Sequence, residues 1–210
     1  MKEYSIAMSL VDYIPVLLFL AAAVLLQRDL YNKLSKGAFA LFSAGTIFVF
    51  CAGFLKATYK LLYAAGVCDF AVLSDMFFPT QALGFLLAGV GILAMLCHKQ
   101  GETGLAAAAP ALFKGTFIFV GTMVAGVLCM NIGLSVLAAK MKKPLASVLF
   151  VIAIVLMLSM GYLSSKDFTA AYMNWAAEIV NIFGQGTLLS AVLVLHKVGL
   201  RDFELKKQEQ

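Results

Sequence analysis

Long apolar segments separated by short charged turns fill almost the whole of this chain. They run over about 6–26, 37–55, 70–97, 113–139, 144–163 and 169–195. Most are long enough, or nearly so, to supply the roughly 20 residues with which a helix crosses about 30 Å of hydrocarbon. Together with their turns they leave no room in 210 residues for a separate soluble domain. We therefore predict an all-α integral membrane protein with about six transmembrane helices.

The composition supports a bilayer environment. Hydrophobic residues make up 62% of the chain and charged residues 13%, against about 45–50% and about 25% in soluble domains. The net charge of +5 does not indicate nucleic acid, because the basic residues are scattered among the ends of the apolar segments. Lys and Arg at those positions are ordinary topogenic residues, so the lipid bilayer is the predicted partner.

The two halves of the chain resemble each other. Residues 1–99 and 113–199 each hold three apolar segments, with a linker at 100–112 and a charged tail at 200–210. In each half a basic cluster follows the first segment, and the third segment ends in His-Lys. Because three spans per repeat is an odd number, we expect the second repeat to be inverted relative to the first. Transporters with inverted repeats bind their substrates near the repeat interface.

Basic residues also predict the orientation. If the six segments alternate in direction, ten of the 16 Lys and Arg residues lie on the side that holds both termini. Positive residues gather on the cytoplasmic side of membrane proteins. We therefore predict a multi-pass protein of the cell membrane with both termini, including the 200–210 tail, in the cytoplasm.

The last apolar segment carries a polar stripe. Asn174, Glu178, Asn181 and Gln185 are spaced by four, three and four residues, which places them on one face of a helix. A carboxylate in hydrocarbon is costly unless it faces protein or water, so such acids often belong to functional sites. The stripe predicts a site for a small solute, a proton or a cation. The alternatives are a carboxylate that reaches the membrane surface and amides that only join helices.

A matching group precedes the end of the first half. Asp75 and Gln81 flank Pro79 and sit in their segment much as Glu178 and Gln185 sit in theirs. We predict that Asp75 and Gln81 belong to the same binding site, although Asp75 could instead cap a helix that begins nearby.

Asp12 and Lys56 form a further candidate group. Both lie toward the same membrane face, and we predict a charge pair between them. The alternative is that each is a separate interface residue.

Several kinds of chemistry have no support in the sequence. Cys51, Cys68, Cys97 and Cys129 form no CxxC motif, and the chain has no HExxH, GxSxG or P-loop pattern. We therefore predict no metal and no cofactor. Small residues at helical spacing, such as Gly84 with Ala88 and Cys129 with Gly133, predict closely packed helices.

Three functions remain open. The repeat and the polar stripe favour a small-solute or ion-coupled transporter. The short loops also suit a non-catalytic membrane module, such as a sensor, a substrate-capture subunit or an accessory partner of another membrane protein. An intramembrane lipid-acting enzyme that uses Glu178 as an acid or base is a third reading, which lacks a nucleophile. The partners would be a small solute, proton or cation, and either further copies of the chain or another membrane subunit.

Overall fold

The computed structural model describes residues 5–97, 116–164 and 171–203, and helices account for nearly all of them. The elements are α1 (Ile6–Val11), α2 (Tyr13–Leu30), α3 (Lys36–Ala65), α4 (Val72–Asp75), α5 (Phe77–Cys97), α6 (Thr116–Lys140), α7 (Pro144–Ser164), α8 (Ala171–Lys197) and the 3-10 turn η1 (Leu200–Asp202). The all-α prediction is confirmed for these residues. The predicted linker 100–112 and most of the 200–210 tail lie outside them.

Five stretches of the described chain are long and apolar enough to cross a membrane. They are Ile6–Leu30, Lys36–Ala65, Val72–Cys97, Ile118–Lys140 and Tyr172–Lys197. The apolar part of α7, Pro144–Met160, is shorter. Long helices of this composition define a multi-pass helical membrane protein.

Two prolines decide where long helices are interrupted. A proline has no backbone N–H, so the carbonyl four residues earlier loses its helical partner. Pro15 stands four residues after Val11, where α1 ends, and Pro79 stands four residues after Asp75, where α4 ends. In both cases the next helix begins two residues before the proline. The breaks at Asp12 and Met76 therefore follow directly from the sequence.

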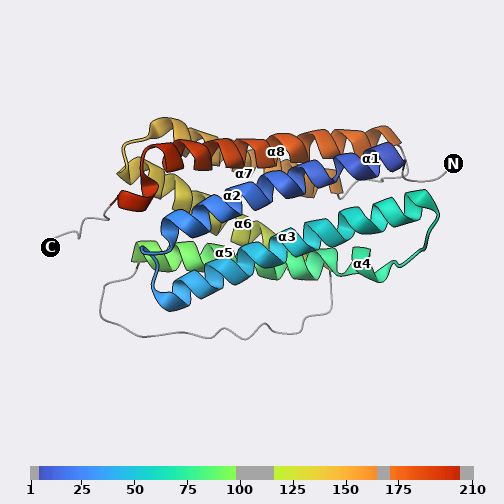
Figure 1. The fold of residues 1–210 in the computed structure, drawn as a ribbon, viewed down its shortest axis with the longest axis horizontal. Coiled ribbons are helices and arrows are strands. Elements are labelled where there is room, and N and C mark those ends of the chain that lie inside the picture. Colours follow the sequence, from blue (N-terminus) through green and yellow to red (C-terminus); the bar gives the residue numbers. More distant parts are fainter. Residues whose placement is uncertain (1–4, 98–115, 165–170, 204–210) are drawn as a thin grey trace.

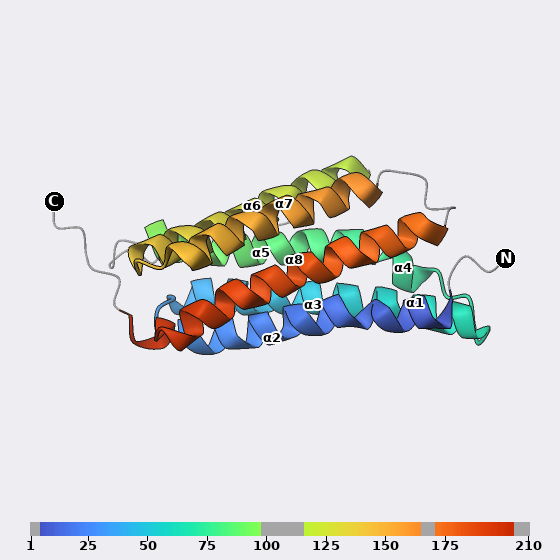
Figure 2. The ribbon, with the colours of Figure 1, turned by 90° about the horizontal axis from the view of Figure 1, so that it is seen from above.

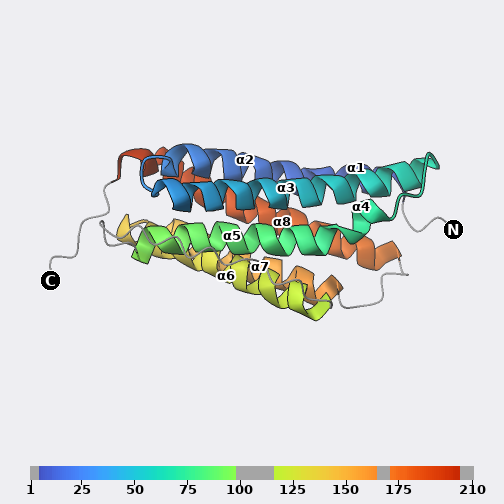
Figure 3. The same cartoon turned by 90° about the horizontal axis from the view of Figure 1, so that it is seen from below.

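Six long helices form a closed ring in chain order. α2 contacts α3, α3 contacts α5, and the sequence continues through α6, α7 and α8, which returns to α2. Figures 1 and 2 show these helices running along the length of one elongated bundle. Figure 3 shows α5 between α3 and α6 on the opposite face. The ring brings side chains from all six helices toward a common interior.

The direction of the second triplet differs from the prediction. Gly89 of α5 faces Cys129 of α6. Further along both helices, Ile92 of α5 faces Gly133 of α6, so the two helices are parallel. α2 and α8 are parallel too, since Leu18 faces Gly186 and Asp29 bonds to His196.

Each triplet therefore starts at the same end of the bundle, and the arrangement is not inverted. The start of α1 and the turn η1, where the described chain begins and ends, lie at opposite ends of the bundle (Figure 1), whereas the prediction expected both on one side. The prediction failed because it assumed that the chain reverses direction between α5 and α6.

The apolar core fills the end of the bundle near η1. Its fully buried members include Leu30, Phe42, Ile92, Leu134, Phe150, Leu195 and Leu200. Glycines let the backbones approach, because a Cβ at Gly126 would lie 2.4 Å from the Phe85 carbonyl carbon. The prediction of close packing through small residues is confirmed at Gly84, Gly89 and Gly133. The interior at this end is filled by packed side chains, and we call it the solid end. The cavity lies toward the other end.

Candidate functional site

A cavity of about 360 Å³ lies in the half of the bundle nearer α1. All six ring helices contribute to its wall. Its apolar lining includes Phe19, Phe50, Phe77, Phe78, Phe85, Met123, Met157 and Met160. Its polar lining is Asp12, Lys56, Lys60, Ser74, Gln81, Asn174, Glu178, Asn181 and Gln185. Polar groups that converge in an apolar cavity are the usual form of a small-molecule site.

Helix α8 presents its polar stripe to this cavity. The side chains at 174, 178, 181 and 185 all line it, and Glu178 is only 7% exposed. The opposite face is apolar and points outward, with Ile179 51% and Phe183 63% exposed. A helix that is polar inside and apolar outside suits a bundle surrounded by lipid, because the ionisable residue then faces the interior. All four residues of the predicted stripe therefore line the cavity.

Four charged side chains meet at the edge of the cavity. Lys60 Nζ lies 2.5 Å from Asp12 Oδ2 and 4.0 Å from Glu178 Oε1. Lys56 Nζ lies 3.9 Å from the centroid of the Phe77 ring and is close enough to Asp12 and Glu178 to interact with their charges. Two acidic and two basic side chains therefore lie together, and ionisable groups are removed from water at lower cost when opposite types are paired in this way.

Helix breaks and helix spacing position these charges. Asp12 occupies the joint between α1 and α2, which Pro15 creates. Lys56 and Lys60 are four residues apart on α3 and so share one face. Tyr13 Oη of α2 and Thr58 Oγ1 of α3 lie 2.9 Å apart and form a hydrogen bond between these helices. Because Lys60 lies near both Asp12 and Glu178, the cluster links the joint between α1 and α2 to α3 and to α8.

Three oxygens of the lining lack a hydrogen-bond partner among the described residues. They are Asp12 Oδ1, Glu178 Oε2 and Gln185 Oε1, and each is buried. A buried acceptor without a donor is unfavourable by about 1–3 kcal/mol. A donor group that entered the cavity would satisfy these oxygens.

The structure brings most of the sequence-predicted site residues together. Glu178, Asn181, Gln185, Asn174 and Gln81 line the cavity, as do Asp12 and Lys56. Asp75 does not: it is exposed at the end of α4, where Ser74 lines the cavity instead.

The charge pair also has a different member. The ion pair of Asp12 is with Lys60, while Lys56 stacks on Phe77. The sequence prediction chose Lys56 as the partner of Asp12 and not its neighbour Lys60. The four-residue spacing from Lys56 could have identified it, because that spacing puts both ammonium groups on one helix face.

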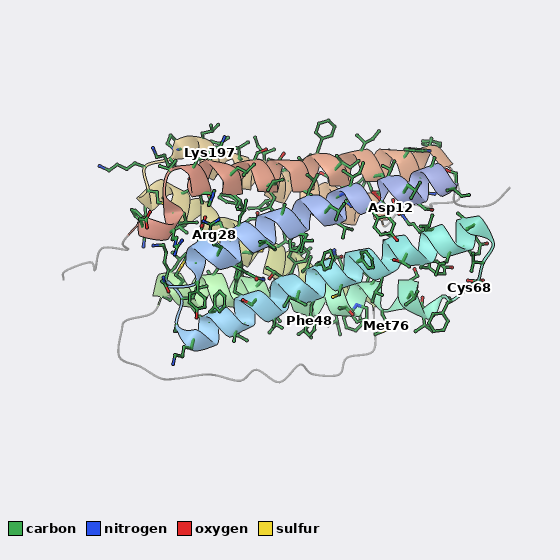
Figure 4. The ribbon with its side chains drawn as sticks, in the orientation of Figure 1. Asp12, Arg28, Phe48, Cys68, Met76 and Lys197 are labelled. Carbon is green, nitrogen blue, oxygen red and sulfur yellow. The ribbon has the colours of Figure 1, made fainter. Side chains whose placement is uncertain are left out.

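A second buried acid lies at the other end of the bundle. Asp29 of α2 is 2% exposed, and its Oδ2 is 2.8 Å from His196 Nδ1 of α8. The surrounding side chains are those of the solid core, including Leu30 and Leu195. Figure 4 shows the separation of the two ends, with Asp12 toward α1 and Arg28, the neighbour of Asp29, at the same end as Lys197.

In the described ranges, no group of three or more His, Cys, Asp or Glu side chains is arranged to hold a metal ion. No protein-family model matches the sequence, and comparisons with curated proteins and with solved structures give no match. The site therefore has to be interpreted from its own chemistry.

Proposed function

We propose that this protein is a membrane transporter for small solutes that carry a protonated amine, and that the central cavity is its binding site. The observation that carries the proposal is the set of three buried acceptor oxygens at 12, 178 and 185. Ammonium groups donate three hydrogens and are attracted to carboxylates, so one such group can satisfy several of these oxygens. The aromatic and methionine side chains of the lining would contact the apolar part of the solute.

The cluster of four charges supports the same proposal. Asp12 already pairs with Lys60, whereas the Glu178 carboxylate is 4.0 Å from that ammonium group. Glu178 is therefore the less completely paired acid and the preferred contact for a cationic solute. Lys56 is a basic side chain of the same cavity. Its attraction to a carboxylate would favour solutes that are zwitterionic, such as amino acids.

The architecture is compatible with transport. Each triplet of long helices runs in the same order and direction, and parallel repeats related by an axis along the membrane normal occur among transporters. The α5–α6 contact and the α8–α2 contact are both parallel, as such an axis would require. The cavity occupies one half of the bundle and the solid core the other. A site that reaches one membrane face at a time is the basis of alternating access.

The distribution of charge suggests which face is cytoplasmic. The described basic residues at the η1 end are Arg28, Lys33, Lys36, Lys140, Lys142, Lys143, Lys197 and Arg201. The described basic residues of the other half are Lys56 and Lys60. We infer from the positive-inside rule that η1 faces the cytoplasm and that the cavity lies toward the opposite membrane face. The parallel triplets make this asymmetry larger than an inverted arrangement would.

Uptake into proteoliposomes tests the proposal. The panel comprises zwitterionic amino acids, simple amines and carboxylic acids, each measured with the wild-type protein, Glu178→Gln and Asp75→Asn. We expect uptake of amine-bearing solutes and a decrease of about tenfold or more in Glu178→Gln, because a charge-assisted hydrogen bond is lost. Asp75→Asn is the matched control and should transport normally, since Asp75 lies outside the cavity.

Two outcomes would contradict the proposed site or the proposed function. One is uptake that is equal in the wild type and in Glu178→Gln. The other is the absence of uptake for every solute, together with copurification of a defined membrane partner, which would favour an accessory role.

A further inference from the structure

A second hollow lies at the opposite end of the bundle and shares no residue with the central cavity. It is a groove of about 450 Å³ lined by Val24, Gln27, Arg28, Tyr31, Asn32, Phe39 and Arg201. These residues come from the last turns of α2, the turn that follows it, the first turn of α3, and η1. Nothing in the proposed transport of amines uses this groove.

Two arginines reach the groove from distant parts of the chain. Arg28 lies near the end of α2, and Arg201 lies in η1. Gly199, with a φ of 80°, turns the chain after α8, and the side chain of Leu200 is fully buried. The Lys33 ammonium group donates to the carbonyl oxygen of Phe203 and so fastens η1 to the turn after α2. The fold therefore holds both guanidinium groups at one site.

Both arginines are available to an anion. Each is exposed, and among the described residues neither has a carboxylate within 4.0 Å. Asp29, the nearest acid to Arg28 along the chain, is buried and bonded to His196. Guanidinium groups bind phosphate through paired, charge-assisted hydrogen bonds. Asn32 and Tyr31 add neutral donors to the same lining.

The groove also has an apolar side. Val24, one turn before Arg28, is 54% exposed on the outer surface of α2. Tyr31 is 64% exposed, and its ring meets that of Phe39 edge-on with centroids 5.1 Å apart. Tyrosines at the ends of membrane helices sit at headgroup level. The groove therefore spans the boundary between hydrocarbon and headgroups, with its cations on the headgroup side.

We infer that this groove binds the headgroup of an anionic phospholipid. Arg28 and Arg201 hold the phosphate, Tyr31 and Asn32 contact the polar headgroup, and an acyl chain runs along the surface at Val24. Basic pockets between membrane helices on the cytoplasmic side bind anionic lipids in this way. The lipid would join α2, α3 and η1, the elements that close the solid end of the bundle.

Native mass spectrometry of the full chain in mild detergent tests this inference. The probes are phosphatidylglycerol, phosphatidylcholine and inorganic phosphate, titrated against the wild type, an Arg28→Gln/Arg201→Gln variant and a Lys140→Gln/Lys197→Gln variant. The two variants lose the same charge at the same end, but Lys140 and Lys197 do not line the groove. We expect wild type to prefer phosphatidylglycerol, and the arginine variant to bind it at least about tenfold more weakly, because two charge-assisted contacts are lost.

The lysine variant should bind within about twofold of the wild type. Equal weakening in both variants would replace the site with a general attraction between charges. Equal binding of phosphatidylcholine would exclude recognition of an anionic lipid. Saturation by inorganic phosphate, with loss of the lipid preference, would assign the groove to free phosphate. If the glutamine variant does not fold, Arg28→Lys/Arg201→Lys keeps the charge but loses the paired geometry, and wild-type affinity in it would overturn the assignment.

Discussion

The helices α2 and α8 meet at a buried acid at each end of their contact, and the two acids have different surroundings. Asp29 is 2% exposed and bonds to His196 within the solid core. Asp12 is 5% exposed, but it borders a cavity, pairs with Lys60 and stands near Glu178 and Lys56. Burial alone therefore does not distinguish the two carboxylates. What distinguishes Asp12 is the open volume beside it and the further charges that share this volume.

The largest effect should come from removing one charge of the cavity cluster. Lys60→Met leaves Asp12 without its ion-pair partner, and breaking a buried pair by removing one member is unfavourable by about 3 kcal/mol. Unfolding with a denaturing detergent, followed by far-UV circular dichroism, measures this free energy. Lys56→Met is the comparison variant, because Lys56 has no carboxylate within 4.0 Å among the described residues and its cation–π contact is worth about 1 kcal/mol. Equal losses in both variants would mean that Asp12 depends on the two lysines alike.

A smaller loss is expected along the α5–α6 contact, which runs between the two ends. A valine at Gly126 would place its Cβ 2.4 Å from the Phe85 backbone, whereas nothing lies within 4 Å of a Cβ at Gly121. Overpacking of this kind is unfavourable by about 1–3 kcal/mol. The unfolding free energy should fall in Gly126→Val and stay close to the wild-type value in Gly121→Val. An unchanged Gly126→Val protein would contradict the close parallel contact.

Asp29→Asn should lower the free energy of unfolding by about 1 kcal/mol, the usual contribution of one hydrogen bond. It should leave solute uptake unchanged. This variant sharpens the comparison because it removes a carboxylate as buried as Asp12. The measurements are the unfolding free energy and proteoliposome uptake of the amine-bearing solutes. Loss of uptake with normal stability would show that the solid end takes part in transport and that the contrast between the ends is wrong.

The last prediction concerns membrane topology and not stability. It is that the two triplets have the same orientation in the membrane. Asn32→Cys and Lys142→Cys each place a thiol in the turn after the first long helix of a triplet. In a parallel arrangement a membrane-impermeant maleimide labels both from the same side of the membrane. Cys68, exposed at the other end of the bundle, should be labelled from the opposite side (Figure 4). Labelling of the two introduced thiols from opposite sides would restore the inverted arrangement.

The helical periodicity of the sequence predicted much of the candidate site. A stripe such as 174–185 has a fixed geometry once the segment is helical, and an acid on that stripe has to avoid lipid. The predicted pairing of Asp12 depended on something else, the register between α2 and α3, and a shift of one helical turn exchanges Lys56 for Lys60. Asp75 was included because its spacing resembled that of Glu178. The resemblance assumed that Asp75 and Gln81 share one helix. Pro79 ends α4 at Asp75, so Asp75 is not part of α5, which carries Gln81.

The spacing of residues in the sequence could not predict the direction of the second triplet. An odd number of spans predicts inversion only if every connection reverses the chain. The contacts of Gly89 and Gly133 show that α5 and α6 do not have this relation. The basic clusters at 28–36 and 140–143 contained the missing information, because the same cluster recurs in both halves. Placing both clusters on one side gives a larger charge asymmetry than placing them on opposite sides.

The proline breaks give the cavity a mechanical property. Asp12 sits at the joint between α1 and α2, and Phe77, which carries the Lys56 contact, is the first residue after the joint between α4 and α5. At each joint a backbone hydrogen bond is missing, so bending there deforms the chain with less resistance than bending within a helix. A solute that bound Asp12, or that drew Lys56 away from Phe77, would therefore act on these two joints. Under the proposed function, occupancy of the site and the angle of these joints would be coupled by the same few contacts.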